Sequence, residues 1–147
     1  MPKRLTTDQI EQYHRHGFLS PIRVMSEDAA ISLRQQIEAF EAAQGKPLHG
    51  TQRTKCSLLF PFVYNLFASE AVLDVVEDLI GPDILHYQCG AWFKEPESGS
   101  YVSWHQDCTY YGLDPLELVS GWVALSPATS ETGCMQVVPG SHREGVL

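Results

Sequence analysis

Positive charge is scarce in this sequence. The 147 residues include 10 Lys and Arg against 18 Asp and Glu, which gives a formal net charge of −8, and the basic residues form no cluster. Binding to a nucleic-acid backbone depends on clustered Lys and Arg, so we expect no nucleic-acid partner.

Closely spaced cysteines and long apolar runs are also missing. The four cysteines are far apart and form no Cys-x-x-Cys pair, which argues against a structural zinc site: Cys56, Cys89, Cys108 and Cys134. No apolar run approaches the roughly 20 residues of a membrane-spanning helix, and the N-terminus has no secretory hydrophobic segment. We therefore expect a cytoplasmic protein with reduced thiols and no membrane partner.

What is present is the composition of an ordinary globular chain. Apolar residues make up 44% of the sequence and charged residues 19%, which is typical of a folded domain and not of a disordered segment. The length predicts at most one domain, residues 1–147, with a helical part over about 1–82 and a strand-forming part over 83–147.

Three helices are predicted within residues 1–82, mainly from the residues that can cap their ends. Thr6 has the character of an N-cap with Gln at the capping-box position, and Gly17 suits the C-terminal cap. Ser26 is expected to cap a second helix that Gly45 ends. A third helix is predicted over 70–80.

Outside these three helices the sequence predicts a loop and several strands. The stretch 46–55 is predicted to be a loop. After residue 82 the apolar pattern changes from helical to alternating, which predicts strands over 84–94, 101–105, 118–126 and 134–138. Helices followed by strands indicate an α+β protein in which N-terminal helices pack on an antiparallel sheet.

His105 and Asp107 are the candidate metal ligands. At a strand end, side chains two residues apart point to the same face, so one cation could take the imidazole nitrogen and the carboxylate oxygen together. Such a pair is two-thirds of the 2-His-1-carboxylate triad of non-haem iron(II) oxygenases. By itself the His-x-Asp pattern is common, and a surface His beside a turn Asp would explain it equally.

The pattern is accompanied by further blocks in a fixed order. They are Lys55-Cys56-Ser57-Leu58-Leu59-Phe60-Pro61, Gly81-Pro82-Asp83-Ile84-Leu85, Trp104-His105-Gln106-Asp107, Ser120-Gly121-Trp122-Val123-Ala124-Leu125-Ser126 and Gly133-Cys134-Met135-Gln136-Val137-Val138-Pro139-Gly140-Ser141-His142-Arg143. In this order and at these spacings the chain resembles the phytanoyl-CoA dioxygenase family of iron(II)- and 2-oxoglutarate-dependent oxygenases.

The resemblance implies a fold and a reaction. The fold would be a double-stranded β-helix, or jelly roll, of which this chain would supply about half, with the helices packed on it. The reaction would use Fe(II), 2-oxoglutarate and dioxygen to hydroxylate a small organic substrate. In halogenating relatives of similar sequence a small residue replaces the carboxylate, so Asp107 favours hydroxylation. The acidic balance mildly disfavours an anionic acyl-CoA substrate.

The resemblance also implies that parts of the site are missing. In the family a second metal-binding His, and then an Arg that binds the distal carboxylate of 2-oxoglutarate, follow several dozen residues after the His-x-Asp. The downstream His142 belongs to a separate Pro-Gly-Ser-His turn. We therefore expect an incomplete oxygenase domain whose isolated chain is inactive and self-associates, unless His86 or His142 completes the triad.

Three further residues are candidates for binding the cosubstrate. Lys55 and Trp122 resemble family residues near 2-oxoglutarate, although a solvated loop Lys is the more ordinary explanation for Lys55, and a core aromatic residue is an equal one for Trp122. Gln88 is a polar residue on the strand predicted near the site, while Gln106 should point away from the metal. Tyr110 and its neighbours could line the substrate entrance or simply pack as a loop.

Two other functions are compatible with the sequence. The chain could be a catalytically inactive jelly-roll fragment that acts as a binding or interaction module. It could also be another metal enzyme such as a cupin, although cupin sites usually group several His residues.

Overall fold

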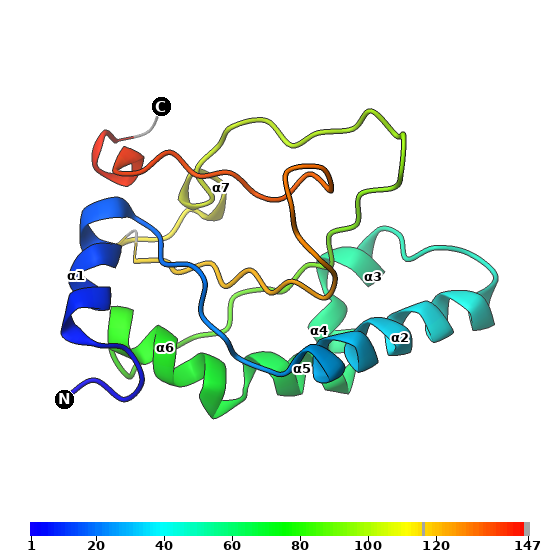
Figure 1. Cartoon of the computed structure of the whole chain (residues 1–147), viewed down its shortest axis with the longest axis horizontal. Helices are drawn as coiled ribbons and strands as arrows, with labels where there is room; N and C mark the ends of the chain where they lie inside the picture. Colours follow the sequence, from blue (N-terminus) through cyan, green and yellow to red (C-terminus); the bar gives the residue numbers. More distant parts are fainter. Residues whose placement is uncertain (116, 146–147) are drawn as a thin grey trace.

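The computed structural model describes residues 1–115 and 117–145. Within these ranges the helices are α1 (Thr7–His16), α2 (Glu27–Gln44), α3 (Thr51–Thr54), α4 (Cys56–Leu59), α5 (Pro61–Phe67), α6 (Glu70–Ile80), α7 (Cys108–Tyr111) and the 3-10 turn η1 (Ser141–Arg143). Most of the helices lie along one side of the molecule, and residues 83–140 run as a long looped segment over the other side (Figure 1).

The predicted ends of α1 and α2 are confirmed. Thr6 accepts a hydrogen bond from the Gln9 backbone N–H while the Gln9 side chain accepts one from the Thr6 N–H, which completes the capping box. Ser26 caps α2 through the N–H of Ala29. Gly17 and Gly45 end the two helices in the left-handed conformation.

The loop predicted over 46–55 is wrong in its second half. Residues 51–67 form α3, α4 and α5 in close succession, and Pro61 begins α5, where its missing N–H costs nothing. These helices are too short to show a helical repeat in the sequence. Their stability comes from packing, because Cys56, Phe60 and Val63 are all buried.

The core lies where these short helices meet α2 and the segment after α6. Its buried residues form one cluster: Ile37, Leu48, Cys56, Phe60, Val63 and Cys89. The Phe60 ring meets the Phe40 ring of α2 edge-on, with centroids 5.0 Å apart. Only Cys89 in this cluster comes from the looped half of the chain, so the core is essentially a helical one.

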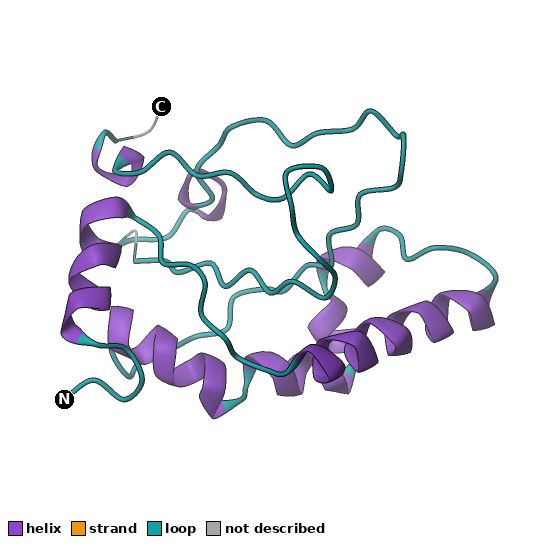
Figure 2. Cartoon of the chain, in the orientation of Figure 1, coloured by secondary structure: helices purple, strands orange, loops and turns teal. Residues whose placement is uncertain are grey.

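The predicted jelly roll is wrong. None of the strands expected at 84–94, 101–105, 118–126 and 134–138 forms, and no strand occurs in residues 1–115 and 117–145 (Figure 2). The alternating apolar residues do not form one buried face: Cys89 is buried in the core, but Leu85, Trp92 and Tyr101 are 85%, 74% and 84% exposed. A strand requires a neighbouring backbone to pair with. In 84–94 the one such contact to a distant segment is the Ala91 N–H bond to the Arg53 carbonyl, 2.8 Å long.

The ends of the described chain are held to helices. The Gly140 N–H donates to the His16 carbonyl at 2.8 Å, and η1 lies beside the end of α1 (Figure 1). None of the described helices combines the length and apolar character needed to cross a membrane.

Candidate metal centre

His105 and Asp107 lie together. The His105 Nε2 is 3.2 Å from the Asp107 Oδ1, and the two side chains keep 36% and 39% of their surface exposed. The prediction that they share a face was based on a strand, but the segment is a bend followed at once by α7. Local chain geometry, without a sheet, brings the two donors into contact.

Hydrogen bonds fix the orientation of both side chains. The His105 Nδ1 is 2.8 Å from the Ser103 carbonyl oxygen, which can only accept, so Nδ1 carries a proton. On the carboxylate, Ser120 Oγ donates to Asp107 Oδ2 at 2.6 Å. The ligand atoms Nε2 and Oδ1 are thus left facing each other. Backbone and hydroxyl partners of this kind commonly orient metal ligands.

The distance between the facing atoms can be compared with that between two ligands of one metal ion. With Nδ1 donating to the Ser103 carbonyl, Nε2 can face Oδ1 in two ways: as an N–H donor in a hydrogen-bonded ion pair, or through its lone pair with a metal ion between the two atoms. Adjacent ligands at about 2.1 Å from one divalent ion stand roughly 3 Å apart when they subtend a right angle. The observed separation fits two neighbouring positions on one metal.

A third ligand does not accompany the pair. Within the ranges 1–115 and 117–145 no group of three or more His, Cys, Asp or Glu side chains is placed to hold a metal ion. His86 stacks on Phe67, with ring centroids 6.2 Å apart and planes at 16°. His142 points its Nε2 at the His14 carbonyl, 3.1 Å away at the end of α1.

The Gln106 side chain makes its hydrogen bonds with the segment 141–145. Its amide N–H group donates to the carbonyls of Gly145 at 2.9 Å and Ser141 at 3.4 Å. The 139–143 turn in turn satisfies backbone carbonyls of α1 through Gly140, His142 and Arg143. The residue between the two candidate ligands is therefore connected to α1 through this turn.

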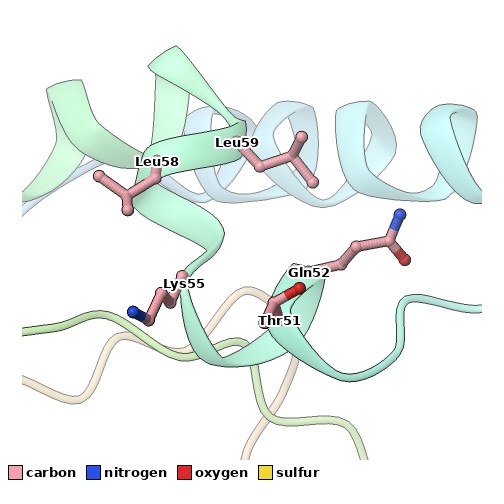
Figure 3. Close-up of a pocket in the computed structure, with 5 residues that line it drawn as sticks. All are labelled: Thr51, Gln52, Lys55, Leu58 and Leu59. Carbon is pink, nitrogen blue, oxygen red and sulfur yellow. The ribbon is translucent and has the colours of Figure 1, made fainter.

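Lys55, Gln88 and Trp122, the three cosubstrate candidates, differ in their surroundings. Lys55 lines an open pocket of about 310 Å³ with Thr51, Gln52, Leu58 and Leu59, where the Lys55 and Gln52 side chains point away from one another (Figure 3). Gln88 donates to the Tyr111 hydroxyl at 3.2 Å, and Trp122 is 48% exposed. No hydrogen bond among the described residues joins any of the three to His105 or Asp107.

Sequence reasoning missed two neighbours of the pair. Ser120, the hydrogen-bond donor to Asp107, gave no signal of its own because a single Ser has no diagnostic spacing. Tyr110 was considered only for the substrate entrance, and its ring centroid lies 6.1 Å from that of His105. The Ser120 bond to Asp107 and the approach of Tyr110 to His105 could be found only from the folded chain.

The structure thus brings one imidazole and one carboxylate, the two candidate metal ligands, into contact. Comparison with known proteins identifies the family: the sequence profile of the phytanoyl-CoA dioxygenase family matches residues 13–146. This chain belongs to that family. No solved structure matches it.

Individual relatives agree with this assignment. The chain is 46% identical over 70 residues to phytanoyl-CoA dioxygenase domain-containing protein 1 of Danio rerio, covering 47% of this chain and 23% of the relative. It is 47% identical over 55 residues to the Mus musculus protein of the same name, covering 37% and 19%. L-proline trans-4-hydroxylase of Streptomyces griseoviridis is 26% identical over 152 positions, covering 92% of this chain and 55% of the relative. The chain spans about half or less of these relatives.

Proposed function

We propose that the protein to which this chain belongs is an Fe(II)- and 2-oxoglutarate-dependent dioxygenase that hydroxylates a small organic substrate. The observation that carries the proposal is the contact of His105 Nε2 with Asp107 Oδ1 at 3.2 Å, inside the stretch that matches the family. When bound, iron and 2-oxoglutarate supply the activation of dioxygen.

The role of the chain's own residues is to hold and orient. Ser103 fixes the His105 tautomer through its carbonyl, so that Nε2 is the nitrogen free to bind iron. Ser120 occupies Oδ2 of Asp107 and leaves Oδ1 for the metal. Two ligands from this chain hold iron weakly, and a third ligand completes the triad in the active protein.

Hydroxylation is favoured over halogenation because Asp107 provides a carboxylate at the second ligand position. A small residue there would leave room for a halide. The similarity over 92% of this chain to a protein named as a proline hydroxylase supports the same reaction type. We assign Lys55, Gln88 and Trp122 to the cosubstrate on the family resemblance.

The test is removal of the carboxylate. In the full-length protein, Asp107→Ala should abolish conversion of 2-oxoglutarate to succinate and weaken Fe(II) binding at least tenfold, because one of the metal ligands is lost. Asp83→Ala is the matched control, since Asp83 is also an exposed Asp of the looped half but lies outside the pair. Unchanged turnover in Asp107→Ala would remove Asp107 from the metal shell and end the proposal.

A second candidate function is an inactive binding or interaction module. The observation that favours it is the lack of a third His, Cys, Asp or Glu beside the pair in the described ranges. The two functions differ in the unmutated full-length protein: the module should neither bind Fe(II) stoichiometrically nor produce succinate, whereas the dioxygenase should do both.

A further inference from the structure

Two cysteines that the candidate metal centre does not use meet in the core. The Sγ atoms of Cys56, at the start of α4, and Cys89, in the looped half, are 3.4 Å apart. Their residues are 1% and 7% exposed, and both thiols are free. The Cys56 Sγ is also 3.5 Å from the Cys89 carbonyl oxygen, so the two segments touch at backbone as well as at side-chain level.

The two thiols are not equivalent. The hydrogen bond from the Cys89 thiol lowers the pKa of Cys56, and burial opposes this effect. The same hydrogen bond, together with burial, raises the pKa of Cys89 well above its ordinary value. Cys56 is therefore the thiol that ionises first, and a thiolate is the reactive form of cysteine.

We propose that Cys56 and Cys89 are a site of reversible disulfide formation, with hydrogen peroxide as the oxidant. The Cys56 thiolate attacks one peroxide oxygen, the O–O bond breaks, and Cys56 becomes a sulfenic acid as hydroxide leaves. The Cys89 sulfur then attacks the Cys56 sulfur, the S–O bond breaks, and water leaves with the Cys89 proton. In total, two thiols and one peroxide give one disulfide and two water molecules.

Little movement is required for the bond to form. A disulfide has an S–S distance of about 2.05 Å, so the sulfur atoms must approach by roughly 1.4 Å from the observed 3.4 Å. The backbones are already held together, because the Ala91 N–H donates to the Arg53 carbonyl at 2.8 Å. Burial selects a small oxidant, which can enter by local opening of the segment 84–94, whose backbone makes a single hydrogen bond to a distant backbone segment.

Each cysteine follows directly on a residue that we assign to the cosubstrate: Lys55 precedes Cys56, and Gln88 precedes Cys89. A disulfide would fix the distance between the backbone that carries Lys55 and the backbone that carries Gln88. The modification itself does not depend on the proposed function, and it can be tested without any assay of catalysis.

The sequence offers a direct readout. Trypsin cleavage after Lys55 and Lys94 releases residues 56–94 as one peptide with both thiols, whereas Cys108 and Cys134 fall in the peptide 95–143. The whole chain is treated with hydrogen peroxide, then denatured in acid, alkylated with iodoacetamide and digested. We expect the peptide 56–94 to lose both alkylatable thiols, to be lighter by two hydrogen atoms, and to recover both thiols with dithiothreitol.

Matched variants separate this pair from the other cysteines. The double variant Cys108→Ser/Cys134→Ser should give the same result, and Cys89→Ser should stop at a Cys56 sulfenic acid that dimedone captures. In urea the preference for the Cys56–Cys89 disulfide should disappear, because the fold no longer holds the two sulfur atoms together. A peptide 56–94 that stays doubly alkylated, carries sulfinic acid, or is linked to another chain after treatment of the folded protein would overturn the proposal.

Discussion

At the scale of single residues, Gly17 shows how closely the two ends of the described chain meet. Its φ of 81° is a left-handed conformation, and a Cβ placed on it would collide with the His142 imidazole. His142 donates from this position to the His14 carbonyl at the end of α1. The conformation of one glycine and the docking of the 139–143 turn are therefore coupled.

We predict that Gly17→Ala destabilises the protein by more than the left-handed conformation alone explains. That conformation costs a non-glycine residue about 1–2 kcal/mol, and displacement of His142 would add the loss of its hydrogen bond, about 1 kcal/mol. Urea unfolding of the variant measures the sum.

Gly45→Ala is the matched control for this prediction. Gly45 ends α2 with a φ of 70°, and nothing lies within 4 Å of the position its Cβ would take. It should show the conformational cost without the collision. Equal losses of stability in the two variants would show that His142 does not pack on Gly17.

At the scale of elements, one carboxylate connects the N-terminal segment to α6. Asp78 accepts backbone N–H bonds from Lys3, Arg4 and Leu5 at 2.7, 2.8 and 2.7 Å. Burial acts to raise the pKa of Asp78, but these backbone hydrogen bonds lower it below its ordinary value. Leu5 is buried beside this contact, so the carboxylate positions the chain that leads into α1.

We predict that Asp78→Asn lowers the free energy of unfolding by about 1 kcal/mol at neutral pH, because a half-buried carboxylate loses charge-assisted hydrogen bonds. The folded-state pKa is depressed, so this contribution is present above the ordinary pKa of 3.8 and is lost as the pH falls through the folded value. Urea midpoints of both proteins should therefore converge as the pH falls below 3.8.

Asp74→Asn is the control for Asp78. Asp74 lies one turn earlier on α6 and makes only a 3.8 Å contact with the Lys3 ammonium. Its substitution should change stability by a few tenths of a kcal/mol at most. A constant difference between Asp78→Asn and the unmutated protein down to pH 3 would contradict the role given to the ionised carboxylate.

At the scale of the whole molecule, the two halves differ in how well they are packed. The helices cover the core, whereas the looped half exposes large apolar side chains: Trp92 is 74%, Trp104 68% and Val102 60% exposed. Its backbone has few partners outside local turns. Unpaired extended segments with apolar side chains invite pairing with another chain.

We predict that the isolated 147-residue chain self-associates, binds Fe(II) weakly and does not turn over 2-oxoglutarate. Analytical ultracentrifugation at increasing concentration should show a rising average mass. Val102→Lys should reduce this association, because a charge on an unpaired extended segment opposes pairing. Leu58→Lys is the control, since Leu58 is 82% exposed but belongs to α4. A compact monomer with stoichiometric iron and succinate production would contradict the prediction.

The sequence by itself determined the features that depend on near neighbours. The caps at Thr6, Ser26 and Gly45 were predicted correctly because a helix end is decided by side chains within a few residues of it. His105 and Asp107 also lie in contact at 3.2 Å, but in a bend that leads into α7 and not at the strand end that the prediction assumed. The family could also be recognised, because its blocks occur in order along the chain.

Only the tertiary structure decided which segments of the chain pack against or hydrogen-bond to each other. Alternating apolar residues predicted strands over 84–94 and 118–126, but alternation describes the faces of a chain and not whether another backbone lies beside it. For the same reason the sequence could not predict the helices α3 to α5, the Ser120 bond to Asp107 or the Cys56–Cys89 contact. Each depends on groups that are distant in sequence, and their approach is set by packing of the whole chain.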